Sequence, residues 1–187
     1  MAEGDSGRRP LISVIGQGDV AGDDPRYDLA VNLGRALVDN GFRIITGGYG
    51  GIMEGASLGA RQSENYREGD IIGILKGFDP TSANRYVDVS ICTGFNFARN
   101  QIIASSDGVV AVGGGAGTLS EIAMAWQLGR LIIALRVDGW SGEVADRPLD
   151  GRKRYSDIPD DRIYGADDEH GVVEILSRHL ARYMHEY

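Results

Sequence analysis

Short apolar runs alternate along the chain with segments in which apolar residues recur at helical spacing. Strands are expected at residues 11–15, 42–46, 70–75, 86–91, 108–112 and 131–137. Helices are expected at 27–40, from about 52 to 62, and at 97–105, 118–128 and 171–183. The expected strands are apolar almost throughout, which is typical of parallel strands covered by helices on both faces. The pattern therefore predicts an α/β fold with a doubly wound, mostly parallel, Rossmann-like sheet.

The same pattern predicts the domain organisation. Residues 11–187 are expected to form a single nucleotide-binding domain, because a chain of 187 residues fits one domain with a sizeable core. Residues 1–10 are polar and lack a signal-peptide core, so a disordered N-terminal tail is expected there. The charged stretch 138–169 has two interpretations: a lid or subunit-contact loop over the carboxyl edge of the sheet, or a solvated excursion. We favour the first, with Trp140 and Tyr155 as packing anchors.

A glycine cluster carries the clearest functional signal. The expected strand 108–112 leads directly into the sequence Gly-Gly-Gly-Ala-Gly-Thr at 113–118, and a helical pattern follows. At such a helix N-terminus the unpaired backbone N–H groups and the helix dipole favour a bound phosphate, and glycine lets the phosphate approach the backbone. The predicted phosphate-binding or nucleotide-binding residues of this turn are Gly114, Gly115, Ala116, Gly117 and Thr118.

A second turn of similar sequence follows the expected strand 42–46. Residues 47–54 and 114–121 share the pattern G-G-x-G-x-[IL]-x-E. The two turns either form two binding edges of one crevice or are two strand-to-helix turns of similar geometry, since tight turns favour glycine. We favour the first interpretation, because a turn alone rarely needs three glycines in four positions. Gly47 and Gly48 join the candidates, together with Gly16 and Gly18 from the turn after the first expected strand.

Familiar nucleotide-binding and metal-binding motifs fit less well. Residues 16–21 match G-x-G-x-x-A, but the expected strand 42–46 lacks the acidic end that the dinucleotide fingerprint requires, which disfavours an NAD enzyme. No lysine follows a glycine cluster, so a P-loop ATPase has little support. His170, His179 and His185 lie in the C-terminal segment without ligand-like spacing, and we expect them on the surface. No metal site and no cofactor are predicted.

Composition restricts the partners and the compartment. The chain has 27 acidic and 19 basic residues and a net charge of −8, which argues against nucleic acid as a partner. No apolar run approaches the ~20 residues of a membrane span, so no membrane partner is expected. A single cysteine gives no intramolecular disulfide framework, and we expect a cytoplasmic location.

Three segments carry a family resemblance. Residues 114–121 resemble the G-G-x-G-T-x-x-E signature of the LOG (Lonely guy, or lysine decarboxylase-like) family. Residues 95–100 are similar to the family segment that ends in Arg-Lys, and residues 46–53 to its G-G-G-x-x-G-L-M turn. The chain has Gly113 in place of the usual proline and Asn100 in place of the lysine. It therefore looks closest to the DprA/Smf-related family 2 branch, which includes molybdenum cofactor carrier-like proteins.

The resemblance implies a homodimer with a nucleotide-like small-molecule ligand and a possible phosphoribohydrolase activity. Such an enzyme splits the N-glycosidic bond of a nucleoside 5′-monophosphate into a free base and ribose 5-phosphate. Backbone N–H groups of Gly115 to Thr118 would hold the 5′-phosphate. Glu121 would stabilise the oxocarbenium-like transition state or orient the attacking water, and Arg99 would clamp phosphate or ribose oxygens.

Each of these assignments has an alternative. Thr118 and Glu121 have the spacing of a capping box, in which the glutamate only caps the helix. Arg99 fits a surface arginine that bridges locally. For the whole protein, the alternative is a non-catalytic nucleotide-binding or molybdenum-cofactor-binding carrier. A DNA-binding, DprA-like role comes third, because of the acidic charge.

Overall fold

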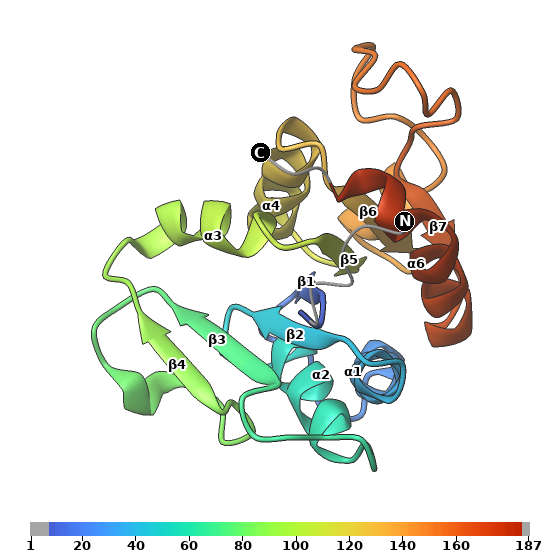
Figure 1. Cartoon of the computed structure of the whole chain (residues 1–187). Coiled ribbons are helices and arrows are strands. Elements are labelled where there is room, and N and C mark those ends of the chain that lie inside the picture. The colour runs from blue at the N-terminus through green and yellow to red at the C-terminus, as the bar shows by residue number, and fades with distance from the viewer. Residues whose placement is uncertain (1–7, 185–187) are drawn as a thin grey trace.

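The computed structural model describes residues 8–184, whose strands form one seven-stranded parallel sheet (Figure 1). The strands are β1 (Leu11–Gly16), β2 (Arg43–Thr46), β3 (Ile71–Leu75), β4 (Val89–Cys92), β5 (Gly108–Val112), β6 (Leu131–Leu135) and β7 (Tyr164–Ala166). Their order across the sheet is β4-β3-β2-β1-β5-β6-β7. The chain winds outward from β1 to one edge, returns to β5 and winds to the other edge, which places a topological switch point between β1 and β5. The predicted doubly wound sheet is confirmed.

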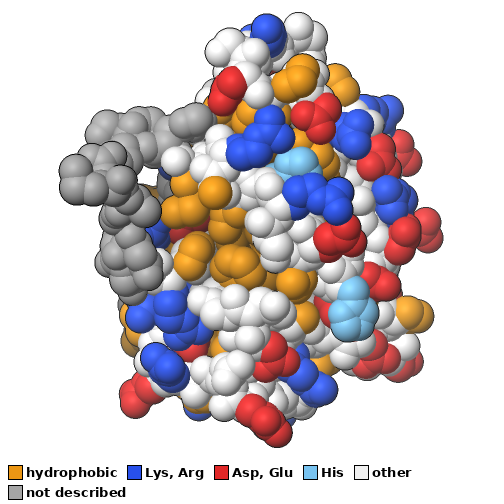
Figure 2. All heavy atoms as spheres, turned by 45° about the vertical axis from the view of Figure 1, so that its right-hand side comes forward, with side chains coloured by type: hydrophobic (Ala, Val, Ile, Leu, Met, Phe, Trp, Pro, Cys, Tyr) orange, Lys and Arg blue, Asp and Glu red, His pale blue; other side chains and the backbone are white. Residues whose placement is uncertain are grey.

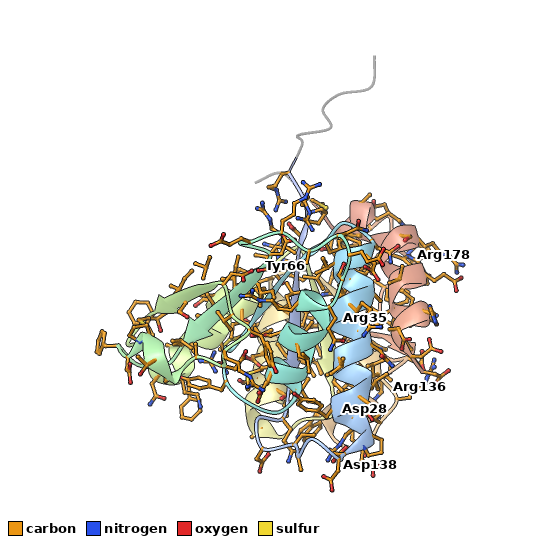
Figure 3. The ribbon with its side chains drawn as sticks, turned by 90° about the horizontal axis from the view of Figure 1, so that it is seen from below. Asp28, Arg35, Tyr66, Arg136, Asp138 and Arg178 are labelled. Atoms are coloured by element: carbon orange, nitrogen blue, oxygen red, sulfur yellow. The ribbon has the colours of Figure 1, made fainter. Side chains whose placement is uncertain are left out.

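Helices cover both faces of the sheet. On one face α1 (Pro25–Asp39), α2 (Ile52–Arg61) and α6 (Glu169–Tyr183) lie side by side (Figure 3). On the other face lie α3 (Asn100–Ala104), α4 (Ala116–Gln127) and α5 (Trp140–Val144). Two short 3₁₀ helices, η1 (Pro80–Ser82) and η2 (Asn96–Arg99), complete the described elements. Alternate residues of each central strand face opposite layers, so the sheet separates two hydrophobic cores.

Three expected elements differ from the structure. The strand expected at 86–91 begins only at Val89, because residues 84–87 form a turn in which the N–H of Val87 donates to the carbonyl of Asn84. The helix expected at 97–105 divides into η2 and α3, with Asn96 at φ 50, a conformation that asparagine tolerates better than most residues. The strand expected at 131–137 ends at Leu135, because the N–H of Val137 turns back to the carbonyl of Leu135 at 2.8 Å. This tight turn changes the direction of the chain at the carboxyl edge of the sheet.

The charged stretch 138–169 contains α5 and β7, neither of which was expected. β7 pairs in parallel with β6 and extends the sheet by one strand. Three residues that include a glycine are too short to give a periodic pattern, which explains why the sequence did not indicate this strand. Of the two expected anchors, Tyr155 packs edge-on against Tyr183 with ring centroids 5.2 Å apart, whereas Trp140 stays 39% exposed.

Residues 8–10 of the expected N-terminal tail are attached to the sheet. Arg8 pairs with Asp107 at 2.8 Å, and Arg9 pairs with the buried Asp70 at 2.5 Å. Residues 1–7 lie outside the described part of the chain. None of the described helices is long and apolar enough to cross a lipid bilayer.

The expected surface position of the histidines is wrong for His179. Its side chain is buried, with its ring 4.5 Å from that of Tyr164, because α6 presents it to β7. His170 is exposed, as expected, and His185 lies outside the described residues.

Candidate functional site

A pocket of about 290 Å³ opens at the carboxyl edge of the sheet, beside the switch point between β1 and β5. In Figure 3 the labelled Asp138 lies near this edge and Tyr66 near the opposite one. The turns after β1, β2, β3 and β5 meet there, together with η2 and the first residues of α3 and α4. The lining residues are Ile15, Gly16, Gln17, Gly18, Gly47, Tyr49, Met53, Lys76, Phe97, Arg99, Asn100, Gly115, Gly117, Thr118 and Glu121.

The structure brings most of the expected site residues together in this pocket. Those that line it are Gly16, Gly18, Gly47, Arg99, Gly115, Gly117, Thr118 and Glu121. Three others, Gly48, Gly114 and Ala116, lie in the same turns but do not line the pocket. Contact with a ligand stays a prediction for all of the expected site residues.

The N-terminus of α4 presents free backbone donors to the pocket. The helix begins at Ala116, and Gly115 caps it without a side-chain hydrogen bond. Within the described residues, no protein acceptor binds the N–H groups of 115–118, as expected for the first turn of a helix. Gly114 has φ +93, and a Cβ there would lie 2.2 Å from Oγ1 of Thr118. Glycine is therefore required for the turn to close over the buried Thr118.

The start of the stretch 138–169 holds this turn in place. The hydroxyl of the fully buried Ser141 accepts a hydrogen bond from the N–H of Gly113 at 2.7 Å and donates one to the carbonyl of Leu135 at 2.6 Å. The N–H of Trp140 donates to the carbonyl of Gly114 at 3.0 Å. No residue of 138–169 lines the pocket. The stretch thus supports the glycine turn before α4 and does not line the pocket as the expected lid would.

The second glycine turn, at residues 47–51 after β2, contributes to the pocket in a different way from the turn at 113–118, although the two sequences are similar. Gly47 lines the pocket, and a Cβ there would lie 2.6 Å from Nη1 of Arg99. Gly48 is buried, with its N–H bound to Oγ1 of Thr46 at 3.0 Å. The first N–H of α2, that of Ile52, donates to the carbonyl of Gln17 at 3.0 Å. Both turns reach one pocket, but the first N–H of α2 is bound to a protein carbonyl, whereas the N–H groups of 115–118 have no acceptor in the described chain.

Glu121 is a buried carboxylate without a protein hydrogen-bond partner in the described chain. Its side chain is on the second turn of α4 and the residue is 8% exposed. The capping-box alternative is wrong, because α4 begins at Ala116 and Thr118 is a helical residue, not the cap. Burial raises the pKa of Glu121 to about 7, against the opposing effect of Arg99 and, to a smaller extent, Lys76. The group can therefore exchange a proton near neutral pH.

Arg99 is buried beneath the pocket, so the alternative of a surface arginine is wrong. It is 4% exposed, and Nη1 donates to the carbonyl of Gly47 at 3.1 Å and to that of Ile74. Its Nε is buried without a hydrogen-bond partner among residues 8–184. Burial lowers the pKa of Arg99, and the charge of Glu121 opposes this shift. The side chain thus ties the ends of β2 and β3 together and brings a positive charge to the pocket.

Sequence reasoning missed several lining residues, above all Lys76. This lysine is the first residue after β3, and its Nζ lies 5.0 Å from the ring centroid of Phe97 and 5.7 Å from that of Tyr49. Its position at the carboxyl end of a parallel strand could have identified it, by the same argument that identified the glycines. Tyr49 and Phe97 gave no such signal. Asn100 is buried and donates to Oγ of Ser120 at 2.8 Å.

The family model of the SLOG cluster4 family matches residues 9–158. The chain belongs to the SLOG cluster4 family. This agrees with the resemblance to LOG-like proteins and their DprA-related branch, which rested on the segments 46–53, 95–100 and 114–121.

Proteins similar to this SLOG cluster4 protein include one that binds and one that carries the molybdenum cofactor. An uncharacterized protein of Archaeoglobus fulgidus is 37% identical over 126 residues, which are 67% of this chain and 79% of that one. The molybdenum cofactor binding protein of Rippkaea orientalis is 31% identical, with a TM-score of 0.74 over 91% of this chain and 97% of that chain. The molybdenum cofactor carrier protein of Chlamydomonas reinhardtii is 30% identical, with a TM-score of 0.72 over 93% and 99%.

The DNA processing protein DprA has the same fold. The Streptococcus pneumoniae protein is 19% identical, with a TM-score of 0.61 over 89% of this chain and 61% of that chain. At this identity the likeness concerns the fold alone. Because a DNA processing protein has this fold, the fold does not exclude nucleic acid as a partner. The expectation that this chain does not bind nucleic acid therefore rests on its net charge alone. On the face of the SLOG cluster4 protein in Figure 2, acidic and basic side chains are interspersed, without a continuous basic area.

Proposed function

We propose that this protein binds a phosphate-bearing organic molecule of the molybdenum-cofactor or nucleotide class in the pocket at the carboxyl edge of the sheet, and serves as its carrier. The observation that carries the proposal is the set of N–H groups at residues 115–118 that have no acceptor in the described chain, in a turn that lines the same pocket as Arg99 and Lys76. Helix N-termini of this kind bind phosphate groups. The aromatic rings of Tyr49 and Phe97 offer faces for a flat ring system.

The residues of the pocket fit such a cargo. The described chain has no cluster of three His, Cys, Asp or Glu residues that could hold a metal ion. A cofactor whose metal is bound by its own organic part needs no such cluster. The similarity to two molybdenum-cofactor proteins over more than 90% of this chain supports the same class of ligand.

The test is a binding measurement with a matched pair of variants. Calorimetry with ribose 5-phosphate and AMP, and loading with molybdenum cofactor released from a donor enzyme, measure the phosphate end and the whole cargo separately. Gly115→Ala should weaken the binding of ribose 5-phosphate, AMP and the cofactor, because the added methyl group would stand in the path of the phosphate. Gly151→Ala, a glycine in the 138–169 stretch with open space around it, is the control. Absence of binding by every one of these compounds would refute the proposal.

A second candidate function is the hydrolysis of a nucleoside 5′-monophosphate at its N-glycosidic bond. Glu121 favours it, because a buried carboxylate with a pKa of about 7, beside Arg99, can stabilise positive charge on ribose or activate a water. Incubation with AMP and an N6-substituted AMP, followed by chromatography for free base, tests this activity. Base release that disappears in Glu121→Gln would support the enzyme. Binding of both compounds without base release would leave the carrier function.

We also propose a homodimer formed through the exposed apolar face at β4. Val89 and Ile91 of this edge strand are 44% and 45% exposed, and Phe97 of η2 and Ile102 of α3 are 63% and 38% exposed. Large exposed apolar patches mark interaction sites on soluble proteins. A second copy is the partner that we propose, because the resemblance to LOG-like proteins implies a homodimer.

Light scattering coupled to size-exclusion chromatography tests the dimer. Ile91→Lys should convert the dimer into a monomer, whereas Met184→Lys, at a residue of similar exposure beyond α6, should leave the mass unchanged. A wild-type protein that is monomeric at micromolar concentration would contradict the proposal.

A further inference from the structure

Lys76 is held by its backbone where three segments of the chain meet. Its N–H donates to the hydroxyl of Tyr49 at 2.9 Å, which ties it to the turn after β2. Its carbonyl accepts a hydrogen bond from the N–H of Asn96 at 3.0 Å, which ties it to the beginning of η2. Both neighbours carry an aromatic ring into the pocket, Tyr49 itself and Phe97 from η2. The position of the lysine backbone is therefore fixed relative to both rings.

The ammonium group of Lys76 lies against these two rings and has no ion-pair partner. Its Nζ is 5.0 Å from the centroid of Phe97 and 5.7 Å from that of Tyr49, within the range of cation–π interactions. No carboxylate of the described residues forms a salt bridge with it, in a protein whose net charge is −8. The aromatic rings position the cation without neutralising it, so its charge stays available to a ligand.

The pocket thus has two separate sources of positive potential that are free to meet a ligand. One is the first turn of α4, with its unpaired N–H groups. The other is Lys76, which reaches the pocket from β3, two strands away from β1 across the sheet. Arg99 is a weaker candidate for direct contact, because its Nη1 is already bound to two backbone carbonyls.

We infer that Lys76, together with Tyr49 and Phe97, recognises the ring end of the ligand and selects a ring system that carries negative charge. This inference rests on the proposed phosphate site at α4, since it assigns the opposite end of the same ligand. The ligand class is then a phosphate ester with a second anionic centre on its flat ring or head group. A nucleotide with a neutral base would make the phosphate contact and stack on the rings, but would gain nothing from the ammonium.

Two purine nucleotides that differ in ring charge provide the test. At pH 7.5 the ring of xanthosine 5′-monophosphate is anionic and that of guanosine 5′-monophosphate is neutral, while their phosphates are the same. Calorimetry should show that the wild-type protein binds the xanthine nucleotide roughly tenfold more tightly, because the ammonium meets the charged ring in a partly desolvated site. In Lys76→Met, which keeps most of the apolar stem, the ratio of the two affinities should fall to about one.

Amine labelling of the wild-type protein gives an independent measurement. The chain has two lysines, Lys76 in the pocket and Lys153 in the exposed part of the stretch 138–169, so each serves as a reference for the other. Xanthosine 5′-monophosphate should slow reductive methylation of Lys76 and leave the rate at Lys153 unchanged. Ribose 5-phosphate, which has no base, should leave both rates unchanged although it binds.

The outcomes separate this inference from the proposed function. Equal affinities for the two nucleotides in the wild-type protein, or no protection of Lys76 by the xanthine nucleotide, would overturn the role of Lys76 while ribose 5-phosphate still binds. Failure of ribose 5-phosphate and both nucleotides to bind would overturn the phosphate site itself, and with it the inference.

Discussion

Arg99 and Glu121 are the two buried charges of the pocket, and each opposes the effect of burial on the pKa of the other without forming a direct ion pair. Neither group is neutralised by a contacting partner of opposite charge, so both are held in the apolar interior at a cost in stability. Such uncompensated groups cluster at functional sites.

The first prediction concerns the stability of Glu121→Gln. Because the folded-state pKa of Glu121 is raised from 4.5 to about 7, the folded protein binds a proton that the unfolded chain has released between these values. The contribution of Glu121 to stability is therefore fully present below pH 4.5 and is lost as the pH rises to 7. At pH 8 the variant should be more stable than the wild type, by about 3 kcal/mol at most.

Urea unfolding of both proteins at pH 5 and pH 8 measures this difference. The gain at pH 8 should shrink at pH 5, which also controls for any effect of the substitution that does not depend on charge. A difference that is independent of pH would show that Glu121 does not titrate between these values.

The second prediction is that removal of Arg99 raises the pKa of Glu121 further. The charge of Arg99 is the larger of the two influences that lower this pKa, and that of Lys76 is the smaller. Arg99→Met should therefore move the titration midpoint of Glu121 upward more than Lys76→Met does. Carbon-13 labelling of the glutamate carboxyl groups and an NMR titration, with Glu121→Gln to assign the signal, would measure both shifts. Equal shifts, or a larger one in Lys76→Met, would contradict the proposed order of influences.

The third prediction separates backbone strain from ligand contact in the turn before α4. Gly114→Ala should destabilise the protein, because φ there is +93 and the new Cβ would lie 2.2 Å from Thr118 Oγ1. Gly69→Ala, at φ +91 with open space around the Cβ, is the matched control for the backbone term alone. Thermal unfolding should therefore show a larger loss, by on the order of 1 kcal/mol or more, in Gly114→Ala than in Gly69→Ala. Equal losses would mean that Thr118 moves aside without cost.

The extent to which the sequence predicts this protein depends on how local the determinants are. The strand at 108–112 and the glycine turn after it follow from a continuous apolar run and from backbone requirements within ten residues. The burial of Arg99 is not local, because its hydrogen-bond acceptors are the carbonyls of Gly47, just after β2, and of Ile74 in β3, both far from η2 in the sequence. The contacts of Lys76 with Tyr49 and Phe97 likewise require that three separate segments meet at one edge of the sheet.

The fourth prediction concerns acid destabilisation through His179. Burial lowers the pKa of this histidine, and its Nδ1 is buried without a hydrogen-bond partner in the described chain. The unfolded chain therefore binds a proton more readily than the folded one, so stability should decrease as the pH falls from 6.5 toward the lowered folded-state pKa. His179→Phe keeps a ring against Tyr164 but cannot be protonated, and it should lose less stability between pH 7.5 and pH 5 than the wild type does. Urea unfolding at the two pH values gives the comparison, with the exposed His170→Gln as the control for loss of a histidine elsewhere on α6. If His179→Phe and the wild type lose the same amount of stability on acidification, His179 does not contribute to the loss. The loss would then come from paired carboxylates such as Asp107. The pKa of Asp107 is lowered by its hydrogen bonds from Arg8 and from the N–H of Leu11.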